Sequence, residues 1–563
     1  MEISRADEPR REDSRMKRWR MDPVLMILPA LALLTGVAGQ AYAADCAALA
    51  SLALPQARVE AAEEVTAGAY RPPSGPAQEG LPTFCRVQGV VTPVPGSRIG
   101  FELWMPKDGW NGRLQMFGNG GYSSAISYGE MAGLVRRGYA TLGTDTGHQG
   151  DDPSFAEGRP EAIVDWGHRA VHESVVRAKQ VVASFYGRPA RHTFFAGCST
   201  GGHQAMSSAQ RYPEDFDGII AGASGGNRTH LNAGFLWQYL RNHRTGEDAA
   251  QIIPAAKLRL VGDAVLATCR ADNGARGGGH PADAWLNDPL SCGFDPASLR
   301  CTGEDGANCL TAPQVDALRA MHDGPRNPRT GELIHFPFPR GSENSGGPPN
   351  LPGWSLYWAD PGNPAAPARV NYWRHWAGFG AGWNWWSFDF DRAMATVDER
   401  LAPVINATNP DLSGFRQRGG KLIAYHGMAD PVVPFAESIA YHERVVAAQG
   451  GDEAAARQQV GSFYRLFLVP GMEHCRGGPG PNQPELQAAL ERWVDEGTPP
   501  DQILAHNREG NRPDGAVRFS RPLCPYPQRA VYDGGAAPTM AEGYRCTQFP
   551  GMAVPEIGTS YLR

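Results

Sequence analysis

One pentapeptide in the chain has the residue types of a serine nucleophile. Gly197-Cys198-Ser199-Thr200-Gly201 fits the pattern G-x-S-x-G, in which the serine stands on a sharp turn between a strand and a helix. Glycine is common in this chain, so the pattern alone is weak evidence. Its context strengthens it, because an apolar stretch precedes Gly197 and an amphipathic stretch follows Gly202. A serine that caps an ordinary turn is the alternative interpretation.

A serine hydroxyl is a weak nucleophile near neutral pH and needs a histidine base that an acid orients. Proteins with this type of turn carry the three groups in the order serine, acid, histidine, with the acid and the histidine in loops after strands. The apolar stretch 421–425 leads to Asp430, and the stretch 464–469 leads to His474. We therefore predict Ser199, Asp430 and His474 as a catalytic triad.

Two neighbouring residues compete for these roles. His426 precedes the acid in the same loop, and we expect it to be structural. Glu473 adjoins the predicted base, and we expect its side chain to point away from it.

A tetrahedral intermediate needs two backbone N–H donors for its oxyanion. The N–H of Thr200, the residue after the nucleophile, is one candidate. The second should come from an early glycine-rich loop after a strand, and residues 118–122 (Gly-Asn-Gly-Gly-Tyr) form such a loop. Within it we favour Gly121 over Gly120.

The elements that must position these residues alternate between strands and helices. Residues 226–395 interrupt this alternation, with nine of the fourteen tryptophans and four cysteines. Strands alternating with helices indicate a parallel sheet with crossover connections. We therefore predict one α/β domain with a large insertion. Apolar stretches predict strands at 98–105, 113–117, 138–145, 192–197, 217–222, 421–425 and 465–469, and periodic stretches predict helices at 168–186 and 201–211.

The N-terminus indicates export. A basic run at 17–20 is followed by an apolar run at 23–37 and by Ala41-Tyr42-Ala43, which is the pattern of a signal peptide cleaved after Ala43. About 15 apolar residues are too few to span a bilayer comfortably, so a membrane anchor is the weaker interpretation. We predict a secreted or periplasmic protein without membrane association after cleavage.

The composition supports a folded protein of 563 residues that does not bind nucleic acid. Hydrophobic residues make up 42% of the chain, which is enough for a sizeable core. The formal net charge is −6, and no long basic run follows the predicted signal peptide.

The cysteine count favours disulfides, because ten is an even number and the protein is predicted to be exported. Local spacing leaves Cys198 and Cys475 without a nearby partner, and a bridge between them would join the loop of the predicted nucleophile to that of the predicted base. Zinc is the alternative, but no C-x-x-C pair or regular Cys/His spacing supports it. The sequence does not prove the connectivity. Local spacing suggests Cys46–Cys85, Cys269–Cys292, Cys301–Cys309 and Cys524–Cys546, and leaves Cys198 and Cys475.

Together these residues resemble the tannase and feruloyl esterase family, which includes the mono(2-hydroxyethyl) terephthalate hydrolases. The resemblance rests on Cys198-Ser199, Asp430 and His474-Cys475, and it spans nearly the whole mature chain. It implies an α/β-hydrolase fold with an inserted lid domain, a family counterpart for each of the five disulfides, and Gly121 at the second oxyanion donor. The resemblance extends through 210–213, 217–223, 469–475 and 521–528. The domains expected from it are a signal peptide at 1–43, the first part of the core at 44–225, the lid at 226–395 and the second part of the core at 396–563.

One feature of the family is altered in this sequence. Family lids usually carry a calcium loop, an aspartate-rich segment after the first lid cysteine. The corresponding carboxylate positions here are Arg270, Asn273 and Gly277. A hard cation needs several oxygen ligands, and an arginine repels it. We therefore expect a degraded calcium site, no other metal and no organic cofactor, although three acids could supply ligands: Asp272, Asp283 and Asp288.

The predicted function is that of an exported serine esterase. It would hydrolyse esters of aromatic or phenolic acids, of the feruloyl, galloyl or terephthalate monoester type, through an acyl-enzyme. A peptidase or acyltransferase with the same triad is one alternative, because the nucleophile does not choose the acceptor, and an inactive binding protein is another. The expected partner is a small aromatic ester; the oligomeric state is not predicted. Seven lid tryptophans could form an apolar wall for the acyl group, although we expect most of them in the lid core: Trp354, Trp358, Trp373, Trp376, Trp383, Trp385 and Trp386.

Overall fold

The computed structural model describes residues 44–562, apart from 247, 274–276 and 346–352. The predicted signal peptide at 1–43 lies outside the described residues. Among the residues that are described, no helix combines the length and the apolar character needed to cross a membrane.

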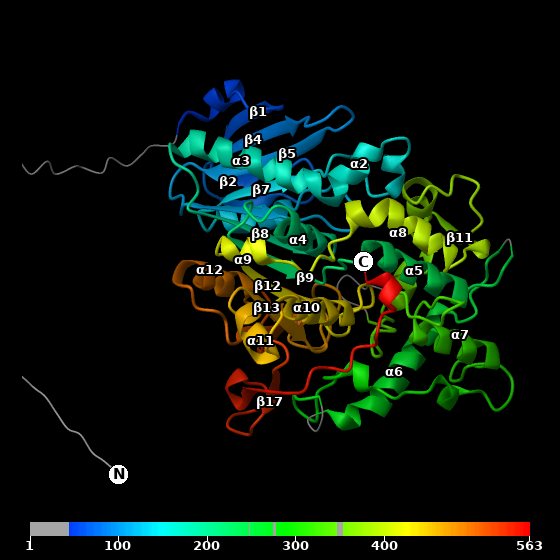
Figure 1. Ribbon diagram of the computed structural model, residues 1–563. Coiled ribbons are helices and arrows are strands. Elements are labelled where there is room, and N and C mark those ends of the chain that lie inside the picture. The colour runs from blue at the N-terminus through cyan, green and yellow to red at the C-terminus, as the bar shows by residue number, and fades with distance from the viewer. Residues whose placement is uncertain (1–43, 247, 274–276, 346–352, 563) are drawn as a thin grey trace, which may run out of the picture. The chain divides into compact units, whose positions relative to one another are not determined.

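A nine-stranded mixed sheet forms the centre of the core, in the order β1-β4-β5-β7-β6-β8-β9-β12-β13 (Figure 1). The pairs from β1 to β7 are antiparallel, and those from β7 to β13 are parallel. Parallel strands require crossover connections, which explains the alternation seen in the sequence. The strands are β1 (Ala57–Val65), β4 (Phe84–Val91), β5 (Ile99–Pro106), β6 (Arg113–Phe117), β7 (Ala140–Thr144), β8 (His192–Cys198), β9 (Gly218–Gly222), β12 (Lys421–Gly427) and β13 (Tyr464–Val469).

Helices cover both faces of this sheet, as an α/β-hydrolase fold requires. One apolar cluster joins the sheet to α3, α4, α10 and α11, and a second cluster joins it to α1 and α12. The carboxyl ends of the parallel strands meet at one edge, so the loops after β6, β8, β12 and β13 converge there. The helices are α1 (Tyr128–Val135), α3 (Ala170–Tyr186), α4 (Thr200–Arg211), α10 (Ala436–Ala448), α11 (Glu453–Gly461) and α12 (Leu486–Glu496).

The segment between β9 and β12 adds no strand to the large sheet among its described residues. Its longer helices pack around apolar clusters that are rich in tryptophan, and Figure 1 shows them (green to yellow) gathered beside the sheet. The short helix α9 (Ser413–Gln417) instead packs into the core cluster of the sheet through Phe415. The last long helix of the segment crosses residue 395, the predicted end of the lid, and the division into domains stays a prediction. The main elements are α5 (Arg228–Asn242), α6 (Leu258–Cys269), α7 (Ala312–Asp323), β10 (Ala359–Asp360), β11 (Asn363–Pro367), α8 (Arg392–Ile405) and α9 (Ser413–Gln417).

Small elements complete the chain. They include three short sheets outside the lid and one short helix that precedes α3. These are β2 (Gly68–Tyr70) with β3 (Gln78–Leu81); β14 (Gln483–Pro484), β15 (Ile503–Arg508) and β16 (Val517–Leu523); β17 (Arg529–Tyr532) with β18 (Tyr544–Thr547); and α2 (Pro160–Val164).

Five disulfides link the described chain, and their pairing is the one that the sequence suggests. Four close loops of 8 to 39 residues. The fifth joins Cys198 to Cys475 across 277 residues, so it connects the carboxyl end of β8 to the loop that follows β13. The other four are Cys46–Cys85, Cys269–Cys292, Cys301–Cys309 and Cys524–Cys546.

Candidate active site

The predicted nucleophile stands on a strained turn. Ser199 lies between the end of β8 and the start of α4, with φ 62° and ψ −122°. A positive φ is unfavourable for a residue with a side chain, and it persists only where the surrounding structure enforces it. The glycines around it permit this packing, since a Cβ on Gly197 would lie 2.6 Å from the backbone of Gly201, and one on Gly202 would lie 2.0 Å from the carbonyl oxygen of Gly222. This is the geometry expected of a nucleophile elbow.

The predicted acid and base are hydrogen-bonded to each other. Nδ1 of His474, in the loop after β13, lies 2.7 Å from Oδ2 of Asp430, in the loop after β12. Asp430 is fully buried, and its Oδ1 accepts the backbone N–H groups of Val432 (2.7 Å) and Val433 (2.9 Å). Burial raises the pKa of Asp430, but the charges and hydrogen bonds of His474 and His426 outweigh burial and hold this pKa well below its ordinary value. Asp430 therefore stays ionised and fixes the proton of His474 on Nδ1, which leaves Nε2 unprotonated, as the predicted base requires.

His426 supports the acid from the other side. The side chain is fully buried, its Nδ1 lies 2.8 Å from the Ser438 hydroxyl, and its Nε2 lies 3.0 Å from the Val433 carbonyl oxygen and 3.3 Å from Asp430 Oδ2. Since a carbonyl oxygen only accepts, Nε2 carries the proton. His426 is thus enclosed by protein groups, in agreement with a structural role.

Glu473 is buried, and its Cγ lies beside Gly478, 3.1 Å from the point where a Cβ would stand. The hydrogen bond to His474 Nδ1 comes from Asp430. The acid that contacts His474 in this structure is therefore Asp430, as the predicted triad requires.

The disulfide Cys198–Cys475 joins the loop of the predicted nucleophile to that of the predicted base. Its Cα atoms are 5.8 Å apart, and Ser199 and His474 are the immediate neighbours of its two cysteines. The backbone N–H of Ser199 also donates to the carbonyl oxygen of Gly222 at 3.0 Å, which ties the elbow to β9. A covalent link and the sheet thus set the position of the base relative to the nucleophile.

The glycine-rich loop after β6 lies against the start of α4. The hydroxyl of Thr200 donates to the carbonyl oxygen of Gly121 at 2.8 Å, and the N–H of Asn119 donates to Gln204 Oε1 at 3.0 Å. Gly121 has φ 55°, a backbone conformation that favours glycine. Because the first N–H groups of a helix have no acceptor within it, Thr200 can direct its N–H toward a ligand. The structure therefore places the two predicted oxyanion donors side by side.

A guanidinium group that the sequence did not single out borders this loop. Nη2 of Arg369 lies 3.2 Å from the point where a Cβ on Gly121 would stand. The same guanidinium lies over the rings of Tyr122 (5.3 Å) and Tyr357 (5.5 Å), and it donates to the carbonyl oxygen of Asp151 at 3.2 Å. Tyr357 and Arg369 line a groove of about 440 Å³. A groove lined by this tyrosine, this arginine and three aspartates (Asp151, Asp152 and Asp360) thus begins beside the predicted oxyanion loop.

Most of the lid tryptophans belong to the core of the lid. Trp354, Trp358, Trp373 and Trp376 are at most 2% exposed, whereas the other three are partly exposed. Trp376 packs edge-on against Tyr122, with ring centres 5.2 Å apart. Its visible role is to support the residue that follows Gly121.

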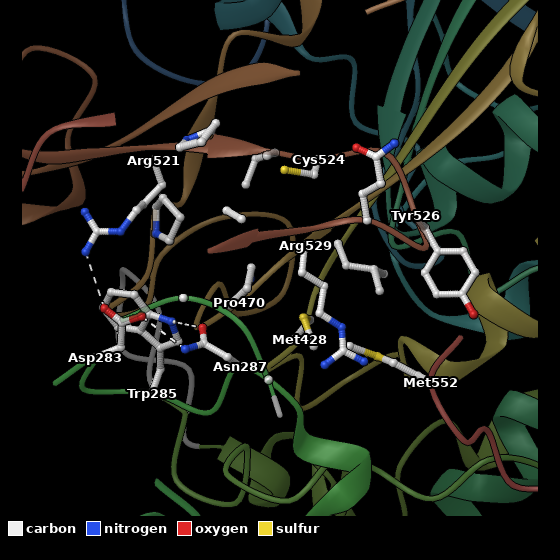
Figure 2. Close-up of a pocket in the computed structure, with 18 residues that line it drawn as sticks. Asp283, Trp285, Asn287, Met428, Pro470, Arg521, Cys524, Tyr526, Arg529 and Met552 are labelled. Carbon is white, nitrogen blue, oxygen red and sulfur yellow. Dashed lines mark hydrogen bonds and ion pairs between the residues drawn. The ribbon is translucent and has the colours of Figure 1, made fainter. Parts of the chain in front are cut away.

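The described part of the altered calcium loop does not fit a calcium ion. Asp283 Oδ1 accepts from Arg521 (3.3 Å), and its Oδ2 accepts from Asn287 Nδ2 (3.1 Å). Asp288 pairs with Arg529 at 3.1 Å. Figure 2 shows Asp283 and Asn287 together with Arg521 and Arg529 of the C-terminal segment; these four residues line a cavity of about 50 Å³. The guanidinium charges occupy the carboxylates that a cation would need.

Of the described residues that line this cavity, none belongs to the predicted triad or oxyanion loop. The side chain of Asn273 is also engaged, since its Oδ1 accepts the N–H of Asn287 and its Nδ2 donates to the carbonyl oxygen of Trp285. The loop is thus held by protein groups.

Comparisons with known proteins agree with this geometry. Residues 85–547 match the family described as "Tannase and feruloyl esterase". An uncharacterised esterase of Xanthomonas campestris pv. campestris is 38% identical, with 94% of this chain and 96% of that protein covered. The mono(2-hydroxyethyl) terephthalate hydrolase of Piscinibacter sakaiensis is 33% identical, with 86% and 88% covered.

Among solved structures, feruloyl esterase B of Aspergillus oryzae superposes with a TM-score of 0.78 at 25% identity, over 89% of this chain and all of that chain. The predicted α/β-hydrolase fold is thereby confirmed. The chain belongs to the tannase and feruloyl esterase family and is a carboxylic ester hydrolase.

Proposed function

We propose that this protein is an exported serine esterase that hydrolyses esters of aromatic and phenolic acids through an acyl-enzyme. The observation that carries the proposal is the His474–Asp430 pair, which the Cys198–Cys475 bridge attaches to the strained turn at Ser199. A base, its orienting acid and a serine elbow are the groups that acyl transfer to a hydroxyl requires. The five disulfides support export, because such bonds persist in oxidising compartments.

The reaction has two halves. Nε2 of His474 takes the Ser199 proton as Oγ bonds to the carbonyl carbon, and the carbonyl electron pair moves onto oxygen, facing the N–H groups of Thr200 and Gly121. The intermediate then expels the alcohol, which receives the proton from His474. In the second half, water attacks the acyl group in the same way and the aromatic acid leaves.

Arg369 lies where it can contact an aromatic acyl group. Its guanidinium is next to Gly121 and can donate to a phenol or carboxylate substituent. Galloyl, feruloyl and terephthalate monoesters each present such a substituent on an aromatic ring. Comparing kcat/KM for these three esters and for a peptide substrate ranks the acids and tests the peptidase alternative.

The catalytic assignment is tested by replacing the nucleophile. We expect Ser199→Ala to lose at least about 10³-fold in kcat on a chromogenic aryl ester, because the remaining groups cannot form an acyl-enzyme. It should also lose labelling by a fluorophosphonate. Ser207→Ala, a buried serine of α4, is the matched control and should keep both. Full turnover by Ser199→Ala would refute the mechanism.

A further inference from the structure

Arg228 is a buried cation whose place in the fold is unusual. It is the first residue of α5 and only 7% exposed. Among the described residues, no carboxylate lies within 4 Å of its guanidinium. Among carboxylates, Glu437 contributes to its electrostatic environment, but Glu437 is already engaged by His335 (3.2 Å) and by the N–H of Asn227 (2.6 Å).

Stability alone does not account for a cation at this position. The N-terminus of a helix carries a partial positive charge, so a cation there is repelled. A buried charge without an ionic partner also loses its hydration without recovering it. Nε of Arg228 lacks a hydrogen-bond partner among the described residues, which adds to the free-energy cost of burying this side chain. Such a group is expected where a negative charge appears during function.

The contacts of Arg228 lead to the predicted oxyanion hole. Its Nη2 lies 3.4 Å from the hydroxyl of Thr200, and that hydroxyl donates to the carbonyl oxygen of Gly121 at 2.8 Å. The guanidinium carbon also lies 5.6 Å from the ring centre of Trp166, which fixes its depth in the core. A continuous chain of polar contacts therefore runs from Arg228 through the two residues whose N–H groups face the substrate carbonyl.

We propose that Arg228 is a positioning residue of the oxyanion hole, which holds the Thr200 hydroxyl against Gly121 and supplies positive potential for the oxyanion. The inference rests on the proposed function, since it assumes that Ser199 is the nucleophile. Arg228 transfers no proton; its charge is present before the reaction and acts only when negative charge develops on the carbonyl oxygen. At a separation of roughly 6 to 8 Å and an effective dielectric constant of about 20, one unit charge changes the rate roughly 30- to 100-fold.

The test compares Arg228→Met, which removes the charge at similar length, with Arg228→Lys, which keeps it. On a chromogenic aryl ester we expect Arg228→Met to lower kcat roughly 30- to 100-fold with KM changed less than about threefold, and Arg228→Lys to recover most of the rate. Phenylboronic acid forms a tetrahedral anion on a serine, so its affinity should fall with kcat, whereas affinity for the product acid should hold. Arg241→Met is the matched control, because Arg241 lies on the same helix, exposed and stacked on Trp237 at 3.9 Å.

Each outcome has a separate meaning. If Ser199 is labelled by a fluorophosphonate and Arg228→Met keeps kcat within twofold, the role of Arg228 is refuted and the proposed function stands. If Arg228→Lys is as slow as Arg228→Met and both lower the thermal midpoint, Arg228 is structural and the proposal is wrong. If wild-type Ser199 is not labelled and Ser199→Ala keeps full turnover, the proposed function falls and this inference falls with it.

Discussion

Removal of the Cys198–Cys475 bridge tests how the fold positions the base. In the chain-entropy treatment, cross-linking a loop of 277 residues restricts the unfolded state by about 5 to 6 kcal/mol, whereas the 8-residue loop of Cys301–Cys309 gives about 2.5 kcal/mol. The double variant Cys198→Ala/Cys475→Ala should therefore lower the thermal midpoint more than Cys301→Ala/Cys309→Ala.

Loss of the two bridges should differ more in its effect on kcat than in its effect on the thermal midpoint. His474 is held by Asp430 at one end of its ring, but its loop is fastened to the nucleophile strand through the adjacent Cys475. A misplacement of about 1 Å costs on the order of 100-fold in rate. We expect that loss in kcat for Cys198→Ala/Cys475→Ala, and a change below twofold for the lid variant.

The assay is aryl ester hydrolysis at 25 °C, with folding of each variant verified by circular dichroism and its thermal midpoint measured. Because both variants lack one disulfide, the lid variant corrects for any general effect of lost cross-linking. A folded Cys198→Ala/Cys475→Ala variant with kcat within twofold of the parent would show that packing alone aligns His474 with Ser199, and it would refute the positioning role of the bridge.

Three further predictions follow from the site. Gly121→Ala should lower kcat by roughly 100-fold, because an alanine is strained at the positive φ of this position and its Cβ would lie 3.2 Å from Arg369. Gly120→Ala, with open space around its Cβ, should keep kcat within threefold of the parent. Equal kcat values in the two variants would contradict the choice of Gly121 as the donor. Asp430→Asn should lower kcat about 10⁴-fold. The pKa of Asp430 is lower in the folded state than in the unfolded state. Its charge therefore stabilises the fold above the unfolded pKa of about 3.9, and this contribution is lost as the pH falls through the folded pKa. In urea unfolding, the difference in free energy of unfolding between parent and Asp430→Asn should be largest at pH 7 and should decrease toward pH 3. Finally, EDTA should leave the thermal midpoint unchanged, because two arginine–carboxylate pairs occupy the altered calcium loop; a midpoint that EDTA lowers and calcium restores would show that a cation binds there.

Much of the fold could be predicted from the sequence because its signals are local. Apolar stretches of strand length, such as 192–197 and 465–469, correspond to β8 and β13. The glycines around Ser199 indicate a tight turn wherever the rest of the chain lies, since their requirement is a close backbone approach. The order serine, acid, histidine indicated Asp430 and His474, and in the structure these two are hydrogen-bonded.

The sequence gives weaker signals for the end of the lid domain. Helix α8 crosses residue 395 because its apolar side continues to pack at Leu401 and Ile405, while the sequence there shows only a change in composition. The tryptophans of the lid likewise give no local sign of which ones face a substrate. Whether such a side chain is enclosed depends on partners far along the chain.

By itself, the sequence determined which segments form strands, where the tight turn at Ser199 lies and which residues are candidates for the triad. It also supplied ten cysteines, enough for five disulfides. Only the tertiary structure decided which charges lie beside the residues predicted to form the oxyanion hole: Arg369 meets Gly121 from a position 248 residues away, and Arg228 reaches Thr200 from the start of α5. No periodicity or motif marks either arginine, because a guanidinium acts through its position in space, and that position is set by the packing of elements remote in the chain.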